Sequence, residues 1–169
     1  MKGMGKKMLG LVLGLSLLVP AIVQAEEGDP SAEVKPVVET VTIMMKVGGM
    51  EMDVDGSKTT MDVAPVIMNG TTYIPLRYFA QGIGGVLDWD QKEMSATLKT
   101  TDMLATFRPG NSKIMLNGAA IELGIYISSQ NDRTLVPVRA VGEMFGWTVQ
   151  FKDNGIIYMT KSMEPAVAS

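Results

Sequence analysis

Hydrophobic and polar residues alternate in parts of this chain and follow a helical period in two short stretches. Residues 94–99 alternate apolar and polar side chains, which predicts a half-buried strand. Residues 41–47 and 50–54 are strand-like runs on either side of Gly48-Gly49, a pattern typical of a β-hairpin. The helical stretches are read from apolar residues spaced three and four apart, which are Leu76, Phe79, Ala80 and Ile83, then Val138, Val141 and Phe145.

Both helical stretches belong to a phrase that the sequence contains twice, at a constant spacing of 62 residues. The first copy covers residues 69–84 and the second covers residues 131–146. The same spacing relates Trp89 to Phe151 without any gap, so the pattern predicts an internal repeat. Nine positions form the structural signature of this repeat: Asn69, Pro75, Arg77, Gly84, Trp89, Asn131, Pro137, Arg139 and Gly146.

Each copy predicts a turn, a short strand, a helix and a glycine that ends the helix. Asn-Gly and Asn-Asp pairs open the copies, because these residues tolerate positive φ. Pro75 and Pro137 fit the first helical position, where a missing N–H costs nothing, and Gly84 and Gly146 fit left-handed helix caps. Such short helices are marginal alone, and about 60 residues bury a thin core. We therefore expect the copies to share one core, with the strands between the helices in a common sheet.

The first 25 residues have the pattern of a secretory signal peptide. Three lysines among the first seven residues precede an apolar run over residues 8–19, and Val23-Gln24-Ala25 is a small-x-small cleavage site. The apolar run is too short and wrongly flanked for an ordinary membrane-spanning helix. We expect cleavage near Ala25 and a mature protein that is secreted or associated with the cell envelope, without a membrane segment.

The rest of the chain divides by composition. Residues 26–40 are polar, with two prolines and several acids, and predict a flexible leader. The folded domain is expected over residues 41–163, with repeat one at 41–100 and repeat two at 101–163. Residues 164–169 are expected to form a short tail.

Composition removes several classes of function. The chain has 15 Lys and Arg against 18 Asp and Glu, and loss of the three signal-peptide lysines would take the net charge from −3 to −6. An acidic mature chain argues against nucleic acid or anionic lipid as a partner. The sequence has no His and no Cys, so the usual general base, the usual nucleophile and most transition-metal ligands are missing. We expect no enzymatic activity, no cofactor and no metal site.

The repeated residues also carry a resemblance to a known family. The motif residues are Asp55-Gly56, Pro65, Ile67, Asn69-Gly70, Ile74-Pro75-Leu76-Arg77 and Trp89-Asp90 in copy one, and Asn117-Gly118, residues 133–139 and Gly146 in copy two. Over residues 41–162 this pattern resembles the copper amine oxidase N-terminal domain-like family, or stalk domain, common in secreted proteins of Gram-positive bacteria. Copy two departs from the motif, because Ile127 stands in place of Pro65 and Phe151-Lys152 in place of Trp89-Asp90.

The resemblance implies an α+β fold, in which an antiparallel sheet of five short strands is wrapped around a helix. Together with the repeat, this gives short strands and short helices built from two 62-residue repeats. The resemblance does not imply amine oxidase chemistry, because copper and the quinone of the oxidases belong to another domain.

Two sets of residues carry alternative functions. Asp88 and Asp90 lie two apart on a strand with Glu93 nearby, so paired carboxylates of a small wall-polysaccharide hydrolase are one alternative. A solvated strand end and turn explains the same acids. The second alternative is a Cu(I) carrier, because thioethers bind Cu(I), and its candidate ligands on the first hairpin are Met44, Met45, Met50 and Met52. Methionine is also an adaptable core filler.

The two signature arginines are unusual, because they fall in the first turn of a helix, where the macrodipole disfavours a cation. One interpretation is structural: each guanidinium clamps strand carbonyls or a carboxylate. The candidate carboxylates are Asp88 or Asp90 for Arg77 and Glu143 for Arg139. The other interpretation is an anion-binding site.

The leading hypothesis is a non-enzymatic stalk-type interaction module of the secreted or cell-envelope kind. The signal peptide, the tandem repeat and the missing catalytic residues support it. We expect its partner to be another protein or a cell-wall polymer.

Overall fold

The computed structural model describes residues 38–163. These residues belong to one compact unit. The predicted signal peptide at residues 1–25, most of the predicted leader at 26–40 and the predicted tail at 164–169 lie outside the described residues.

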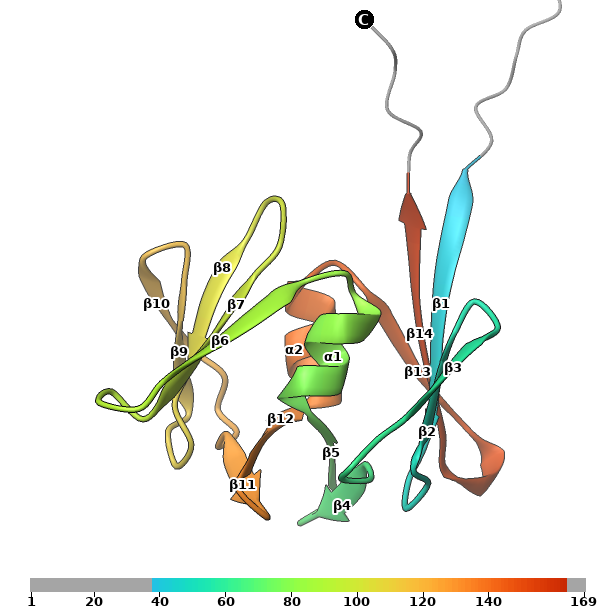
Figure 1. Ribbon diagram of the computed structural model, residues 1–169, viewed down its shortest axis with the longest axis horizontal. Helices are drawn as coiled ribbons and strands as arrows, with labels where there is room; N and C mark the ends of the chain where they lie inside the picture. Colours follow the sequence, from blue (N-terminus) through green and yellow to red (C-terminus); the bar gives the residue numbers. More distant parts are fainter. Residues whose placement is uncertain (1–37, 164–169) are drawn as a thin grey trace, which may run out of the picture. The chain divides into compact units, whose positions relative to one another are not determined.

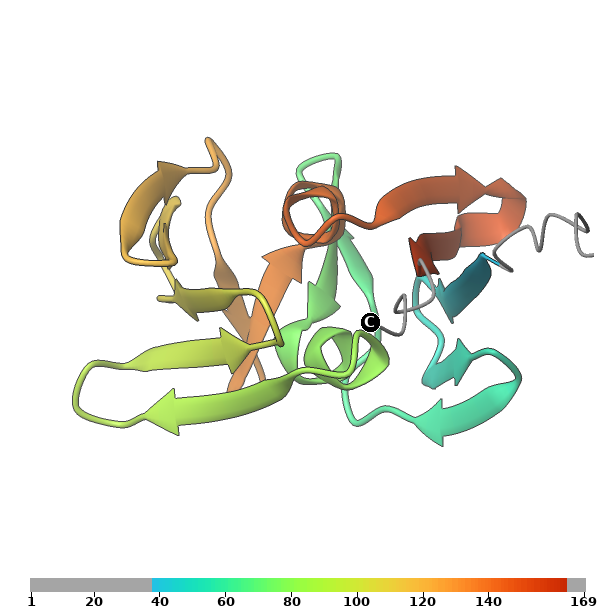
Figure 2. The ribbon, with the colours of Figure 1, turned by 90° about the horizontal axis from the view of Figure 1, so that it is seen from above.

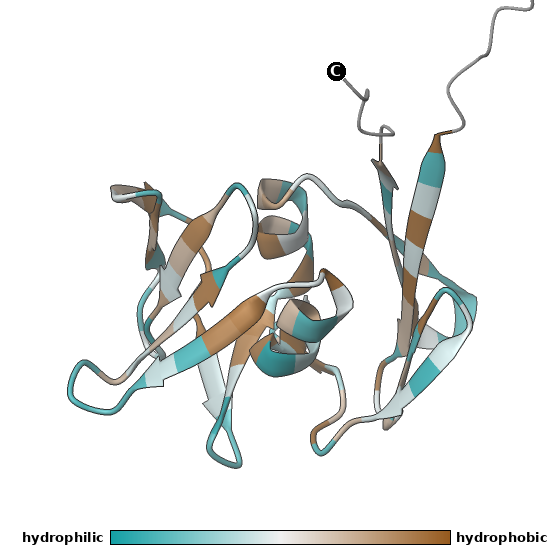
Figure 3. Ribbon diagram, turned by 45° about the horizontal axis from the view of Figure 1, so that its top comes forward, coloured by the Kyte–Doolittle hydropathy of each residue, from teal (hydrophilic) through white to brown (hydrophobic). Residues whose placement is uncertain are grey.

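Strands from both ends of the described chain form a five-stranded antiparallel sheet in the order β13-β14-β1-β2-β3 (Figure 1). The longest pairing joins β1 to β14, from Glu39 opposite Met163 to Lys46 opposite Ile156. Hydrophobic bands alternate with hydrophilic ones along β1, as expected for a strand with one buried face (Figure 3). The strands are β1 (Glu39–Lys46), β2 (Glu51–Val54), β3 (Ser57–Thr60), β13 (Thr148–Lys152) and β14 (Ile156–Met163), with a 3-10 turn at Asp153–Gly155.

A second five-stranded antiparallel sheet has the order β10-β9-β8-β7-β6. Its strand β7 covers most of the stretch predicted from alternation, but Met94 lies in the preceding turn with a φ of 48°. Ser95, predicted on the exposed face, is buried along with Ala96 and Leu98. The strands are β6 (Val86–Asp90), β7 (Ser95–Lys99), β8 (Leu104–Phe107), β9 (Lys113–Leu116) and β10 (Ala119–Glu122).

A four-stranded sheet in the order β11-β12-β5-β4 connects the two copies of the phrase. At its centre β5 and β12 run antiparallel, with Ile74 opposite Val136. These residues occupy the same place in the two copies, so the copies meet around a pseudo-twofold axis at this pair. The resemblance implied one five-stranded sheet, whereas residues 38–163 form three sheets. The strands are β4 (Val66–Met68), β5 (Thr71–Pro75), β11 (Ser128–Gln130) and β12 (Arg133–Pro137).

Two short α-helices, α1 (Leu76–Gly82) and α2 (Val138–Met144), follow β5 and β12. Pro75 and Pro137 are the N-cap residues, with extended ψ of 126° and 111°, so the prediction that they occupy the first helical position is wrong by one residue. Both helices end as predicted, on glycines with left-handed φ: Gly84 at 72° and Gly146 at 76°. A backbone hydrogen bond from the residue after each glycine completes the helix end. The Gly85 N–H donates to the Ala80 carbonyl at 2.8 Å, and the Trp147 N–H donates to the Gly142 carbonyl at 2.9 Å.

The helices lie side by side and pack into one core (Figures 1 and 2). The rings of Phe79 on α1 and Phe145 after α2 meet edge to face, with centroids 5.6 Å apart and planes at 78°. The main cluster of buried side chains extends from Ile43 to Met159, so it draws on both copies. The shared core is therefore confirmed. The predicted common sheet is confirmed for β6 to β10, whereas β11 and β12 pair with the first copy's β5 and β4.

Candidate functional site

Arg77 and Arg139 are solvent-exposed on the first turns of α1 and α2. Neither forms an ion pair within residues 38–163, where the ion pairs belong to other residues. The predicted pairing of Arg77 with Asp88 or Asp90, and of Arg139 with Glu143, is therefore wrong. Exposure explains the error, because water screens the helix dipole and removes the need for a compensating partner.

The candidate acids of the hydrolase alternative are exposed and engaged in a turn. Asp90 Oδ1 accepts hydrogen bonds from the N–H groups of Lys92 and Glu93, at 2.8 and 3.0 Å. Glu93 pairs with Arg108 at 3.0 Å. Asp88 lies within β6, opposite Thr97, and is exposed as well. The three acids therefore form no buried pair, and a solvated strand end and turn accounts for them.

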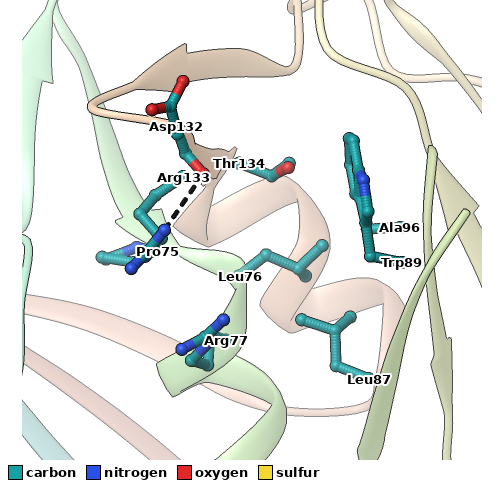
Figure 4. Close-up of a pocket in the computed structure, with 9 residues that line it drawn as sticks. All are labelled: Pro75, Leu76, Arg77, Leu87, Trp89, Ala96, Asp132, Arg133 and Thr134. Carbon is teal, nitrogen blue, oxygen red and sulfur yellow. Dashed lines mark hydrogen bonds between the residues drawn. The ribbon is translucent and has the colours of Figure 1, made fainter. Parts of the chain in front are cut away.

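A cavity of about 270 Å³ lies between α1, β6 and the turn that leads into β12. Its apolar part comes from Leu76, Leu87 and Ala96, and Trp89 closes one side (Figure 4). Arg77 and Arg133 lie across the cavity from Trp89 (Figure 4). Pro75, Asp132 and Thr134 complete the lining. Copy one therefore supplies the helix and the aromatic ring, and copy two supplies the turn.

Trp89 stands between this cavity and a second one of about 440 Å³. Both cavities are also lined by Asp132 and Thr134, so they adjoin along the indole. The side chain is 47% exposed, and its Nε1–H donates to Gln91 Oε1 at 3.1 Å. That bond fixes the orientation of the ring while leaving much of its surface in contact with solvent.

The hollows continue beyond Trp89 along β11. A third cavity of about 380 Å³ shares Pro109 and Ser129 with the second and extends to the exposed ring of Tyr126. Asn69, a signature residue, lines this third cavity with its left-handed φ of 50°. We call these three adjoining cavities the Trp89 groove. Its exposed aromatic rings are those of Trp89 and Tyr126, with serine and threonine side chains between them.

One charged side chain of the groove is held by an ion pair between the copies. Arg133 Nε and Nη2 both donate to Asp62 Oδ2 at 2.8 Å, and the Asp62 N–H donates to the Tyr78 hydroxyl at 2.9 Å. The hydrogen bond from Arg133 is the largest of the causes that hold the pKa of Asp62 below its ordinary value of 3.8, and the charge of Arg77 adds to it. Arg133 is thereby anchored, whereas Arg77 keeps its donors for solvent or a ligand.

This ion pair predicts a pH-dependent contribution to stability. Because the folded-state pKa of Asp62 is lowered, its carboxylate stabilises the fold above pH 3.8, and this contribution is lost as the pH falls through the folded-state pKa. We expect Asp62→Asn to be less stable than the unmodified chain at pH 7, with a smaller difference at pH 3. Urea unfolding at both pH values measures it, with the unpaired surface variant Asp88→Asn as control. A difference that stays constant with pH would contradict the assignment.

Comparison with known proteins identifies the family. The family model described as copper amine oxidase N-terminal domain matches the chain twice, over residues 17–98 and 53–158. The chain belongs to the copper amine oxidase N-terminal domain family. No curated protein and no solved structure matches the chain. In the oxidases this family is a non-catalytic stalk domain, so membership shows a stalk-type module.

The residues of this family member do not fit the copper of the oxidases. The sequence has no histidine, and residues 38–163 hold no group of three Asp or Glu side chains placed for a metal ion. Of the four candidate thioethers, Met45 and Met52 are buried opposite each other in the core. Met44 and Met50 line a surface pocket with two lysines and two acids, in which Lys58 pairs with Glu51 at 2.8 Å, so the four thioethers are divided between core and surface.

No helix within residues 38–163 combines the length and the apolar character that crossing a bilayer requires. The segment with the signal-peptide pattern lies outside those residues.

The signature residues of this stalk-type module therefore have different roles. The glycines and Asn131 shape helix ends and a turn, and the prolines cap the helices. Pro75, Arg77 and Trp89 meet at one cavity, whereas Pro137 and Arg139 line another with Phe151. Sequence reasoning missed the contributions of Tyr126 and Ser129. In the sequence these two residues are only an aromatic ring and a hydroxyl group near turn residues. Their place in the site becomes visible only when β11 is seen to lie near Trp89.

Proposed function

We propose that this chain is a non-enzymatic module, secreted or associated with the cell envelope, that binds a cell-wall polymer in the Trp89 groove. The observation that carries the proposal is the exposed indole of Trp89 between two adjoining cavities. The signal-peptide pattern of residues 1–25 supports the extracellular location. Family membership and the missing nucleophiles and bases support a binding role over catalysis.

We further propose that the module arose as two 62-residue repeats. The bounds of β5, α1 and β6 recur 62 residues later as those of β12, α2 and β13. The two overlapping matches to one family model support the same interpretation. The repeat explains why the Trp89 groove is composite, since each copy contributes its turn to the other copy's helix and aromatic ring.

The chemistry of the groove favours a polysaccharide over a protein surface. A pyranose ring has an apolar C–H face that stacks on an aromatic ring and hydroxyl groups that need polar partners. The groove provides Trp89 and Tyr126 as platforms, with Gln91, Ser129 and Thr134 beside them. Protein interfaces share the aromatic enrichment but are depleted in serine at their cores. A run of three cavities also suits a polymer, which presents the same unit repeatedly.

Replacing Trp89 with alanine is expected to weaken binding to the wall polymer at least about tenfold, since buried tryptophan contacts dominate binding energies. Co-sedimentation of the full chain with insoluble peptidoglycan over a range of polymer concentrations measures the affinity. Leu104→Ala is the matched control, because Leu104 is also 47% exposed but does not line the groove.

Equal binding of the two variants would contradict the groove as the binding site. Absence of peptidoglycan binding by the unmodified chain, together with capture of a protein that Trp89→Ala fails to capture, would replace the wall polymer by a protein partner.

A further inference from the structure

We infer that the fold carries a second binding site, centred on Arg139, that takes the carboxylate of an acidic sugar. The inference deepens the proposed function and rests on it for the choice of a glycan as ligand. It concerns a cavity of about 510 Å³ beside α2, away from Trp89. Apart from Arg139 its lining is uncharged and mostly apolar or small, and includes Ile67, Thr71, Thr72, Ile125 and Phe151.

The charge of this cavity is what selects its ligand. Arg139 is the one charged side chain among its lining residues within 38–163, and no acid lies there to neutralise it. The whole sequence carries a net charge of −3, so this cavity is positively charged although the protein is acidic overall. A cavity with one fixed positive charge and uncharged walls favours an anion attached to an uncharged body.

Phe151 orients the guanidinium group. The Arg139 Cζ atom lies over the Phe151 ring, 5.1 Å from its centroid. This cation–π contact uses none of the guanidinium N–H groups as hydrogen-bond donors, so they stay available. No ion pair in the described part of the chain uses those donors. The guanidinium group is thus held beside the ring while its N–H donors have no ion-pair partner in the described residues, which suits bidentate binding of a planar carboxylate.

The second site is the counterpart of the first across the pseudo-twofold axis. Arg139 and Phe151 occupy the positions of Arg77 and Trp89, and Gly70–Thr72 occupies the position of the turn at 132–134. One difference sets the specificity. The first site adds Asp132 and Arg133, whereas the second has Gly70 and Thr71 at those places. The charges of Asp132 and Arg133 cancel, so both linings have a net charge of +1, and the second site differs in having no acid beside its arginine.

The remaining walls match the body of a sugar. Thr71 and Thr72 provide hydroxyl groups, and Ile67 and Ile125 provide apolar surface for ring carbons. A single arginine fork matches one carboxylate, whereas a phosphate dianion is usually bound by several donors or cations. We therefore assign a carboxylated sugar unit and not a phosphorylated one.

The test is calorimetric titration of the full chain with trigalacturonate, with the neutral maltotriose as reference. We expect the unmodified chain and Trp89→Ala both to bind trigalacturonate more tightly than maltotriose. Arg139→Gln should weaken trigalacturonate binding at least about tenfold, because a charge-assisted bidentate contact is lost. Phe151→Leu, which keeps apolar volume but loses the ring, should weaken it about threefold through lost orientation.

Lys152→Gln is the matched control, because it removes the same charge one residue from Phe151 without lining the cavity. Trigalacturonate binding that is insensitive to Arg139→Gln, or equally reduced by Lys152→Gln, would overturn the second site. Equal competition by inorganic phosphate would overturn the choice of a carboxylate. Trigalacturonate binding that is lost in Trp89→Ala but unchanged in Arg139→Gln would overturn the second site and would agree with binding in the Trp89 groove. If trigalacturonate binding depends on Arg139 but the chain does not sediment with peptidoglycan, the second site is supported and the proposed binding of wall polymer in the Trp89 groove is contradicted.

Discussion

Replacing Phe79 with alanine is expected to lower the free energy of unfolding by about 3–5 kcal/mol, the usual cost of truncating a buried phenylalanine. Phe79 is 1% exposed and lies where the two helices meet, with its ring edge-on to that of Phe145. Each helix has only seven residues, so neither is stable without the packing that this pair provides. A domain of this size is typically stable by about 5–15 kcal/mol, so the variant should be close to unfolding.

Urea unfolding followed by circular dichroism measures the effect. The exposed control Leu104→Ala should change stability by only about 0.5 kcal/mol. A double-mutant cycle with Phe145→Ala should give a coupling of about 0.5–1.5 kcal/mol for the ring pair. A loss below about 1 kcal/mol for Phe79→Ala would mean that the helices do not depend on one another.

The helices and their ends could be predicted from sequence because their determinants are local. Leu76, Phe79 and Ala80 are buried as their spacing predicts, and the glycine after each helix has the left-handed φ that ends it. The sheet pairings could not be predicted in the same way. The pairing of β1 with β14 joins residues more than a hundred positions apart, and no local pattern determines which distant strand a strand joins.

For the same reason, the sequence pointed to single residues of the candidate site but not to their neighbours in space. Repetition drew attention to Arg77, Trp89 and Arg139, but the surroundings of the two arginines depend on contacts between segments that are distant in the sequence. The structural interpretation expected carboxylate or carbonyl partners, whereas both side chains are exposed and form no ion pair within residues 38–163. Each cavity also needs the turn of the opposite copy, and that turn comes into place only through the antiparallel pairing of β5 with β12.

Breaking the chain between Lys99 and Asp102 is expected to abolish independent folding of both fragments. The break lies in the short turn between β7 and β8, where the Thr100 N–H donates to the Met103 carbonyl at 2.9 Å. It leaves β1 to β3 on one fragment and β13 and β14 on the other, so the first sheet is divided. The second sheet is divided as well, between β7 and β8. Each fragment would expose long unpaired edges and half of the common core.

We expect fragments 1–100 and 101–169 to be unfolded alone and to regain native circular dichroism when mixed in equal amounts. A covalent control separates the effect of the break from the effect of losing contacts. Glu39 lies opposite Met163 at the end of the β1–β14 pair, so a short glycine-serine linker can join these residues. A circular permutant linked there and opened at Thr101 keeps every sheet in one chain and should unfold cooperatively. Cooperative unfolding of either separate fragment would show that a single copy is a domain by itself and that the shared core is dispensable.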